Sequence, residues 1–409
     1  MKKFIALLLS ALMLLNAAAA LAEEPVTIKL WHRWSGANEE ILSKMVQEFE
    51  AANPNVKVEI TAKAGEYFEL LQSMIADAAA GNDLPDVFIG GYNLMNYIAT
   101  ELSPVSVDQL APSPEAYQEL LSHFKDSTLP LGQWDGVQVG LPIACSTMVM
   151  YVNLDIFAAA GLTEADIPTT WEELTAVCQT VQDKTDFYGV GIQFPDNWAD
   201  QALVFSAGGN FLAEDGQHVD FSNEGMLQAL TMWQNFYAKG YAPLCTNNEL
   251  MADFTAGNVA MYLTSIMSLP GMNEYCNFNL SVQQTPSFEG KPKQLPVGGA
   301  AMISFSDTQA EKDGVWTFLN YFATEGVKTF VSTGYVNPTT TEVEIQPGQQ
   351  AAYDQMNAIR PWECWPGGSA GLEIETNWLN TRTDIIQGGL DVAQTLKTLE
   401  EESNALLDF

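Results

Sequence analysis

The chain has 409 residues, of which 17 are Lys or Arg and 51 are Asp or Glu, so its formal net charge at pH 7 is −34. Nucleic acids and anionic membranes are bound through basic surfaces, and such an acidic chain excludes both as preferred partners. Its length is enough for two domains, and a hydrophobic content of 47% is ordinary for a globular protein.

The first 22 residues have the pattern of a signal peptide. Lys2 and Lys3 precede an apolar run at 4–15, and Ala20-Leu21-Ala22 forms a small-x-small cleavage site. The apolar run is too short to span a membrane, and no later stretch reaches about 18 apolar residues. The residue directly after the cleavage site is Glu23 and not a cysteine. We therefore expect a periplasmic or extracellular protein that is exported by a cleaved signal peptide and is not lipidated. Without the two lysines its charge is −36, from 15 basic and 51 acidic residues.

Cysteines and histidines give no sign of a metal centre. The five cysteines are widely scattered, form no C-x-x-C pair and predict no disulfide framework, although export leaves open whether any of them pair. His32, His123 and His218 lie far apart and lack the spacing of metal ligands. We predict neither a metal nor a cofactor.

The first part of the mature chain alternates between strand and helix periods. Residues 26–30 and 56–60 alternate apolar and polar side chains, as strands do, whereas apolar residues recur at helical spacing over 41–49 and 67–75. Asn53-Pro54 ends the first helix, and a short buried strand at 85–89 opens into Gly90-Gly91. This β-α-β-α-β order predicts a layered α/β domain with its ligand-side loops at the carboxyl ends of the strands.

Residues 134–174 predict a passage between two lobes. A turn is followed by two strand-like runs that flank the small polar break Cys145-Ser146-Thr147, and Thr170 to Glu173 then form a capping box that begins a helix. Further on, apolar stripes predict helices over 226–237, closed by Gly240, and over 315–322. Residues 254–263 indicate a helix end, a turn and a buried strand.

Four sequence segments together resemble the family 1 extracellular solute-binding proteins of ATP-binding cassette importers. They are LWHRWSG with FEAANPNVKVEI; LPDVFIGG with LSPVS; GLPIACSTMVMYVNLDIFAAAGL with TTWEEL; and FTAGNVAMYL with PVGGAAMISFS and STGYVNPTTTEV. The likeness covers nearly the whole mature chain in the family's order, and it is closest to members that take sugars or glycerol phosphates. It implies a monomeric binder, not an enzyme, that delivers a small molecule to membrane permease subunits.

The resemblance also implies an architecture, the two-lobe type II periplasmic binding protein fold of the α/β class. Each lobe is then a mixed sheet flanked by helices, and hinge crossings join the lobes. The first lobe would comprise 23–143 and 300–335, and the second 146–296 and 343–409. The crossings would fall near 144–146, 297–300 and 335–341, where glycine, proline and small polar residues suit either a hinge or an ordinary turn.

A sugar site needs aromatic rings for the flat C–H faces and planar polar groups for the hydroxyls. The loop after the first strand offers Trp31, Arg33 and Trp34. The resemblance adds further positions, at which relatives have cleft residues or the crossings bring the chain to the cleft: Tyr67, Tyr92, Asn93, Ser146, Thr147, Thr264, Ser265, Gly298, Gly299 and Tyr335. Maltose-type binders have a tryptophan near the place where this chain has Met267, so one stacking ring is missing or replaced.

The C-terminal part is the richest in aromatic candidates. Arg360, Trp362 and Trp365 share the segment RPWECWPGG, and Trp198 stands in PDNWAD. Trp378 and Arg382 are four residues apart, hence on one helical face, and resemble a tryptophan–arginine pair of maltose-type binders. The alternative for each is packing in the core. If Trp378 binds ligand, its replacement by alanine should lower sugar affinity more than tenfold and leave the melting temperature nearly unchanged.

Three functions remain from the sequence. A binder of a neutral sugar or oligosaccharide is favoured, because the strong negative charge opposes anion capture. Glycerol phosphate or a phosphodiester on the same fold is the alternative, with Arg33, Arg360 and Arg382 to meet the phosphate. A secreted glycoside hydrolase would need two carboxylates about 5–9.5 Å apart, and no motif for one is visible.

Overall fold

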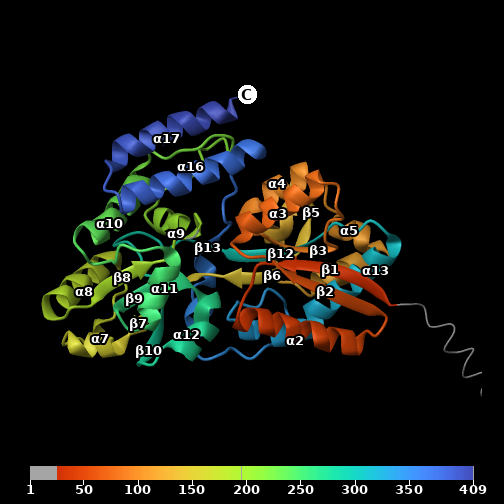
Figure 1. Cartoon of the computed structure of the whole chain (residues 1–409), viewed down its shortest axis with the longest axis horizontal. Coiled ribbons are helices and arrows are strands. Elements are labelled where there is room, and N and C mark those ends of the chain that lie inside the picture. The colour runs from red at the N-terminus through yellow and green to blue at the C-terminus, as the bar shows by residue number, and fades with distance from the viewer. Residues whose placement is uncertain (1–24, 195, 409) are drawn as a thin grey trace, which may run out of the picture.

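The computed structural model describes residues 25–194 and 196–408, and the predicted signal peptide lies outside these ranges. Two separate sheets organise the described chain, one in each half of the molecule (Figure 1). The first has the strand order β2-β1-β3-β12-β6, and the second has the order β10-β7-β9-β8. This is a two-lobe α/β architecture, as the sequence predicts.

The first sheet begins with the predicted β-α-β-α-β unit. Its strands are β1 (Val26–His32), β2 (Val56–Ala62), β3 (Val87–Gly91), β6 (Gly140–Ser146) and β12 (Gly298–Ser304). β1 pairs in parallel with β2 and β3, whereas β12 pairs antiparallel with β3 and β6. The surrounding helices are α2 (Ala37–Ala52), α3 (Tyr67–Ala79), α4 (Met95–Glu101), α5 (Val107–Leu110), α6 (Pro114–Ser122), α13 (Gln309–Tyr321) and α14 (Val327–Phe330). The small hairpin β4 (Gln133–Trp134) and β5 (Val137–Gln138) lies beside them.

The second sheet is formed by β7 (Met148–Asn153), β8 (Tyr188–Ile192), β9 (Val259–Ser265) and β10 (Leu280–Gln284). β9 is central, antiparallel to β7 and parallel to β8. Its helices are α7 (Leu154–Ala159), α8 (Trp171–Lys184), α9 (Trp198–Ser206), α10 (Glu224–Ala238), α11 (Asn247–Thr255), α12 (Leu269–Tyr275) and α15 (Gln350–Tyr353). The two long helices α16 (Ser369–Ile386) and α17 (Val392–Leu407) pack on each other and on α10 (Figure 1).

The chain passes between the sheets at Thr147, the single residue between β6 and β7. The predicted small polar break is therefore narrower than expected, because Cys145 and Ser146 are the last residues of β6 and pair with Gly299 and Gly298. The chain returns to the first sheet through β11 (Leu295–Pro296), which is followed after one residue by β12. β11 pairs in parallel with β13 (Ile359–Arg360). Strands thus continue almost without interruption from one sheet into the other.

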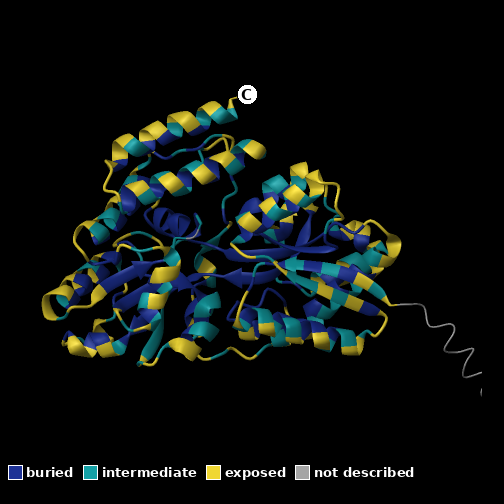
Figure 2. Cartoon of the chain, in the orientation of Figure 1, coloured by how far each residue is buried: buried dark blue, intermediate teal, exposed yellow. Residues whose placement is uncertain are grey.

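The cores are made by the residues that the sequence periods indicate. The buried faces of α2 and α13 lie against strands of the first sheet, and that of α10 lies against α9 and α16 (Figure 2). The capping box of Thr170 with Glu173 begins α8 as predicted. All five cysteines are free thiols, so none of them pair. Within the described residues, no helix is both long and apolar enough to cross a membrane, and no group of three or more His, Cys, Asp or Glu side chains could hold a metal ion.

Candidate functional site

A cavity of about 330 Å³ lies between the two sheets. Segments from both halves of the molecule meet there, many of them at the carboxyl end of a strand or the first turn of a helix, which is where open α/β sheets hold ligands. The lining residues are Arg33, Ser35, Gly36, Ala37, Asn38, Glu66, Tyr67, Ser146, Gln193, Asp196, Trp198, Asn247, Asn248, Met251, Tyr262, Thr264, Ser265, Met267, Ser268, Gly271, Tyr275, Gly298, Gly299, Tyr335 and Trp362.

Contacts across the cavity join the two halves. The Asn38 side chain, on the first turn of α2, donates a hydrogen bond of 3.2 Å to the Met267 carbonyl, which follows β9. The Tyr335 hydroxyl accepts from the Trp34 indole at 3.1 Å and donates to the Met267 sulfur at 3.2 Å. Residues far apart in the sequence therefore enclose the space from several sides.

The charged groups of the cavity form one compact set. The Arg33 guanidinium makes an ion pair with Glu66, lies 4.9 Å from the centre of the Tyr67 ring, and donates to the Gly65 carbonyl at 3.3 Å. Asp196 stands on the other side of the cavity. Burial, with the nearby carboxylate of Glu66 as a second cause, raises the pKa of Asp196 to about 7. Burial also raises the pKa of Glu66, although Arg33 opposes this shift.

The rest of the lining combines rings with amides and hydroxyls. The rings belong to Tyr67, Trp198, Tyr262, Tyr275, Tyr335 and Trp362, and the amides to Asn38, Gln193, Asn247 and Asn248. Gln193 is held in place by Thr264, whose hydroxyl donates to it, and by the backbone N–H of Ser265 at 3.2 Å. Such a surface can stack on a flat apolar face and pair with hydroxyl groups.

Sequence comparison identifies the family. Residues 44–357 match the model of the family described as bacterial extracellular solute-binding protein, which is more than half of the chain. The chain belongs to this family. It is therefore a solute-binding component of an ABC importer, and the family consists of substrate-binding proteins rather than enzymes.

Curated relatives of this solute-binding protein are similar over almost their whole length. The sn-glycerol-3-phosphate-binding periplasmic protein UgpB of Salmonella typhimurium is 26% identical over 93% of this chain and 94% of its own. The protein of the same name from Escherichia coli (strain K12) is 25% identical over 97% and 96%.

Solved structures agree on the fold. UgpB from Mycobacterium tuberculosis, in complex with glycerophosphocholine, has a TM-score of 0.81 at 19% identity and covers 94% of this chain and 99% of its own. The cyclic alpha-maltosyl-1,6-maltose binding protein from Arthrobacter globiformis has a TM-score of 0.75 at 23% identity, with the same coverage. The two-lobe fold predicted from the sequence is thus confirmed.

The cavity of the solute-binding protein brings together about half of the residues proposed from the sequence. They come from both lobes and from the segments between them: Arg33, Tyr67, Ser146, Trp198, Thr264, Ser265, Gly298, Gly299, Tyr335 and Trp362. Met267, which stands near the place of a tryptophan in maltose-type binders, also lines the cavity and contacts Tyr335. For these residues a contact with ligand stays a prediction.

Three proposed residues near the first strand and the crossing lie outside the cavity lining. Trp31 is covered by Lys63, whose ammonium lies 3.9 Å from the ring centre. Trp34 is 2% exposed and packs against Phe330, because its side chain points into the lobe core. Thr147 is buried, and its hydroxyl accepts from Gln355 at 2.8 Å.

Three more proposed residues line no part of this cavity. The Tyr92 hydroxyl donates to the Ala144 carbonyl at 2.9 Å. This bond links the turn before α4 to strand β6. Asn93 is buried beside it. Arg360 pairs with Glu363 and covers the ring of Phe205 at 3.7 Å, and therefore serves the second lobe.

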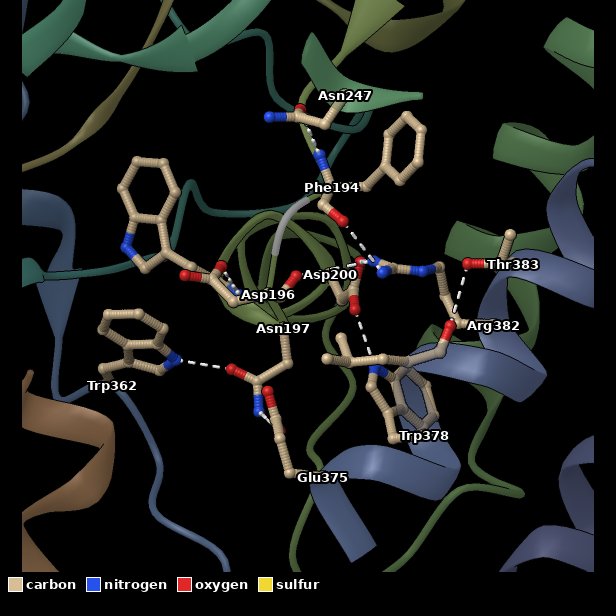
Figure 3. Close-up of polar contacts among 12 residues, drawn as sticks. Phe194, Asp196, Asn197, Asp200, Asn247, Trp362, Glu375, Trp378, Arg382 and Thr383 are labelled. Atoms are coloured by element: carbon tan, nitrogen blue, oxygen red, sulfur yellow. Dashed lines mark hydrogen bonds and ion pairs between the residues drawn. The ribbon is translucent and has the colours of Figure 1, made fainter. Parts of the chain in front are cut away.

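Trp365, Trp378 and Arg382 are not part of the cavity lining, and Figure 3 shows the last two beside Asp200. Trp378 is fully buried and donates to Asp200 at 2.6 Å, and Arg382 makes an ion pair of 2.6 Å with the same carboxylate. Trp365 donates to Glu375. The interpretation of Trp365, Trp378 and Arg382 as ligand residues is not supported. Trp378 and Arg382 lie on the face of α16 that meets Asp200 of α9, and Trp365, which precedes α16, is bonded to Glu375.

Several lining residues were not predicted from the sequence. Glu66, Asp196 and the pair Asn247-Asn248 were not proposed, although each stands next to a helix start that the sequence could have pointed to. Thr246 and Glu249 form a capping box of the kind recognised at Thr170, and Asn247 and Asn248 lie inside it. Helix starts at the carboxyl ends of strands would have been a better guide than aromatic content.

Two adjacent glycines shape the floor of the cavity. A Cβ atom at Gly298 would stand 2.6 Å from the Ser146 hydroxyl and 2.7 Å from the Trp198 indole nitrogen, and Gly299 has a φ of +120°. We expect Gly298→Ala to displace Trp198 and to weaken ligand binding about tenfold, which corresponds to about 1.4 kcal/mol. Calorimetry measures this effect. Gly290→Ala is the control, because it introduces backbone strain at a φ of +73° in an open surface turn that is not part of the cavity lining. Unchanged affinity would show that the ligand does not reach this floor.

Proposed function

We propose that this protein captures a neutral, hydroxyl-rich carbohydrate in the cavity and delivers it to the permease subunits of its importer. One observation carries the proposal. Arg33 is the single cationic side chain among the described residues that line the cavity, and it is already paired with Glu66. Asp196 adds a second carboxyl group. An anionic ligand would therefore meet at least as much negative as positive charge, whereas a neutral one meets no such penalty.

The remaining lining supports the same ligand class. Several rings, each worth on the order of 1 kcal/mol in stacking, together with paired hydrogen bonds from the amides, could reach micromolar affinity, roughly −8 kcal/mol. The volume of about 330 Å³ is at the small end of the range for ligand pockets. A mono- or disaccharide, rather than a long chain, fits a space of this size.

Binding would proceed by closure of the lobes on the sugar, and the closed form is what the permease recognises. We place the hinge near 144–146, 297–300 and 335–341, between lobes comprising 23–143 with 300–335 and 146–296 with 343–409. The hydrogen bond from Asn38 to Met267 supports this view, since it can exist only when the lobes meet. We further propose that the protein acts as a monomer in the periplasm or outside the cell, after its signal peptide is cleaved.

Glycerol phosphate or a phosphodiester is the second candidate. The names of the curated relatives favour it, and so does the helix α2, whose first residues Ala37 and Asn38 line the cavity. The N-cap of α2, Gly36, has no side-chain cap, so backbone N–H groups at this end are free to meet an anion. The nearby Glu66 and Asp196 oppose it.

Isothermal titration calorimetry separates the two candidates. We expect a panel of neutral mono- and disaccharides to include a ligand of micromolar affinity, and sn-glycerol 3-phosphate and glycerophosphocholine to bind at least tenfold more weakly. Tight binding of the phosphates, with no response to any saccharide, would overturn the proposal. Analysis of the saccharides after the titration should show them unchanged, as expected of a binding protein.

A further inference from the structure

A buried carboxyl group on α16 is connected to the cavity wall by hydrogen bonds. Glu375 is 2% exposed. Its Oε2 accepts from the Asn197 side-chain amide at 2.7 Å (Figure 3). The same oxygen accepts from the Trp365 indole, while Oε1 has no partner among the described residues. None of these groups lines the cavity, and the proposed function does not use them.

Asn197 carries the connection to the wall. Its Nδ2 donates to Glu375, and its Oδ1 accepts from the Trp362 indole N–H at 2.6 Å. Because the two ends of the amide are engaged in this way, Glu375 fixes which end faces Trp362. Trp362 lines the cavity, as do Asp196 and Trp198 on either side of Asn197. A single acceptor on α16 thus orders two separate segments of the wall.

We propose that Glu375 is a positioning residue of the binding site: through Asn197 it sets the place of the Trp362 indole in the cavity wall, so ligand affinity depends on whether its carboxyl group carries a proton. A protonated carboxyl group is neutral and can accept from both Asn197 and Trp365 without placing a charge in the interior. An ionised one would place a charge in the interior with one oxygen bare, which is expensive without a paired cation.

The charged groups around Glu375 leave it without such a cation. Arg382, on the same helix, is committed to Asp200 of α9 at 2.6 Å and to the Phe194 carbonyl at 3.0 Å. The other charged neighbours, Asp200 and Asp196, are acidic and cannot neutralise an ionised Glu375. Burial, together with the charges of Asp196 and Asp200, raises the pKa of Glu375 to about 8, although the hydrogen bond from Trp365 and the charge of Arg382 oppose this shift.

The direction of the pH effect follows from this geometry. Above about pH 8 the carboxyl group ionises, and water can reach it only if Asn197 and Trp362 move away from their packed positions. The ligand needs the packed wall, so binding favours the protonated form and affinity falls as the pH rises. A glutamine at this position would not titrate: its carbonyl oxygen can face both donors, and its amide replaces the bare oxygen.

The first test needs no ligand and therefore does not depend on the proposed function. In protein labelled with ¹⁵N-tryptophan, the Trp362 indole resonance is assigned by its absence from Trp362→Phe. We expect it to shift with a midpoint near pH 8 in the wild type and in Glu373→Gln, an exposed glutamate on the same helix, and to stay constant in Glu375→Gln. Absence of the shift in the wild type would overturn the proposal. So would a shift that persists in Glu375→Gln and disappears in Asp196→Asn.

The second test uses the best saccharide from the calorimetric panel, and to this extent rests on the proposed function. We expect the affinity of the wild type to fall roughly tenfold between pH 7.5 and 9.5, that of Glu375→Gln to show no such fall, and that of Glu375→Leu to be weak at both values. Parallel curves for the wild type and Glu375→Gln would refute the positioning role. If no saccharide binds, the proposed function fails, and the indole resonance still decides the role of Glu375.

Discussion

Replacement of Trp378 by alanine is expected to lower the free energy of unfolding by about 3–5 kcal/mol, the range for a fully buried tryptophan. The indole is 0% exposed, with its ring centre 4.8 Å from that of Phe211 and 5.0 Å from that of Phe221. Its loss leaves a large cavity and removes one hydrogen bond from the buried carboxylate of Asp200. Urea unfolding followed by circular dichroism measures the change.

Trp31→Ala is the matched control for this prediction. Trp31 is only partly buried, and its ring is covered by the ammonium of Lys63 rather than by core side chains. We expect its removal to cost about 1 kcal/mol. If instead Trp378→Ala left stability within about 1 kcal/mol of the wild type and abolished saccharide binding, Trp378 would be a ligand residue, as its spacing with Arg382 suggested from the sequence.

Replacement of Arg33 by methionine is expected to weaken saccharide binding by about 30-fold, or about 2 kcal/mol. This is the lower end of the range for removing one partner of a buried charge pair, because the pair of Arg33 with Glu66 is only partly buried. The change leaves Glu66 without its cation, beside Asp196 and with Tyr67 no longer covered. The two carboxyl groups would then dominate the cavity and hold water that a sugar must displace. Calorimetry at pH 7.5 measures the loss.

The pH dependence of this variant provides a check. The pKa of Asp196 is about 7 and that of Glu66 is raised, chiefly by burial in both. Loss of Arg33 removes the cation that holds Glu66 ionised, so both groups should protonate as the pH falls, and we expect Arg33→Met to recover part of its affinity at pH 5.5. Lys57→Met, which removes an exposed cation paired with Glu50, should bind as the wild type does. An Arg33→Met variant that binds saccharide normally would exclude Arg33 from the site.

The pattern of the sequence determined the elements and their order. The alternation at residues 26–30 and 56–60, the helical stripes between them and the capping box at Thr170 all appear in the structure at the expected places. These signals are local, because the spacing of apolar residues within a strand or an amphipathic helix indicates which of its faces is buried. The resemblance of four segments, in their order, to solute-binding proteins then predicted the two-lobe fold and the solute-binding role.

Only the tertiary structure decided which tryptophans face the cavity. Trp362 and Trp365 are three residues apart in one segment, yet the first lines the cavity and the second binds Glu375. Trp378 and Arg382 share a helical face, but α16 packs that face into the second lobe. There Asp200 accepts a hydrogen bond from Trp378 and makes an ion pair with Arg382. A burial pattern shows that a side chain is covered and does not show what covers it. That depends on how segments almost two hundred residues apart come together, which no local period records.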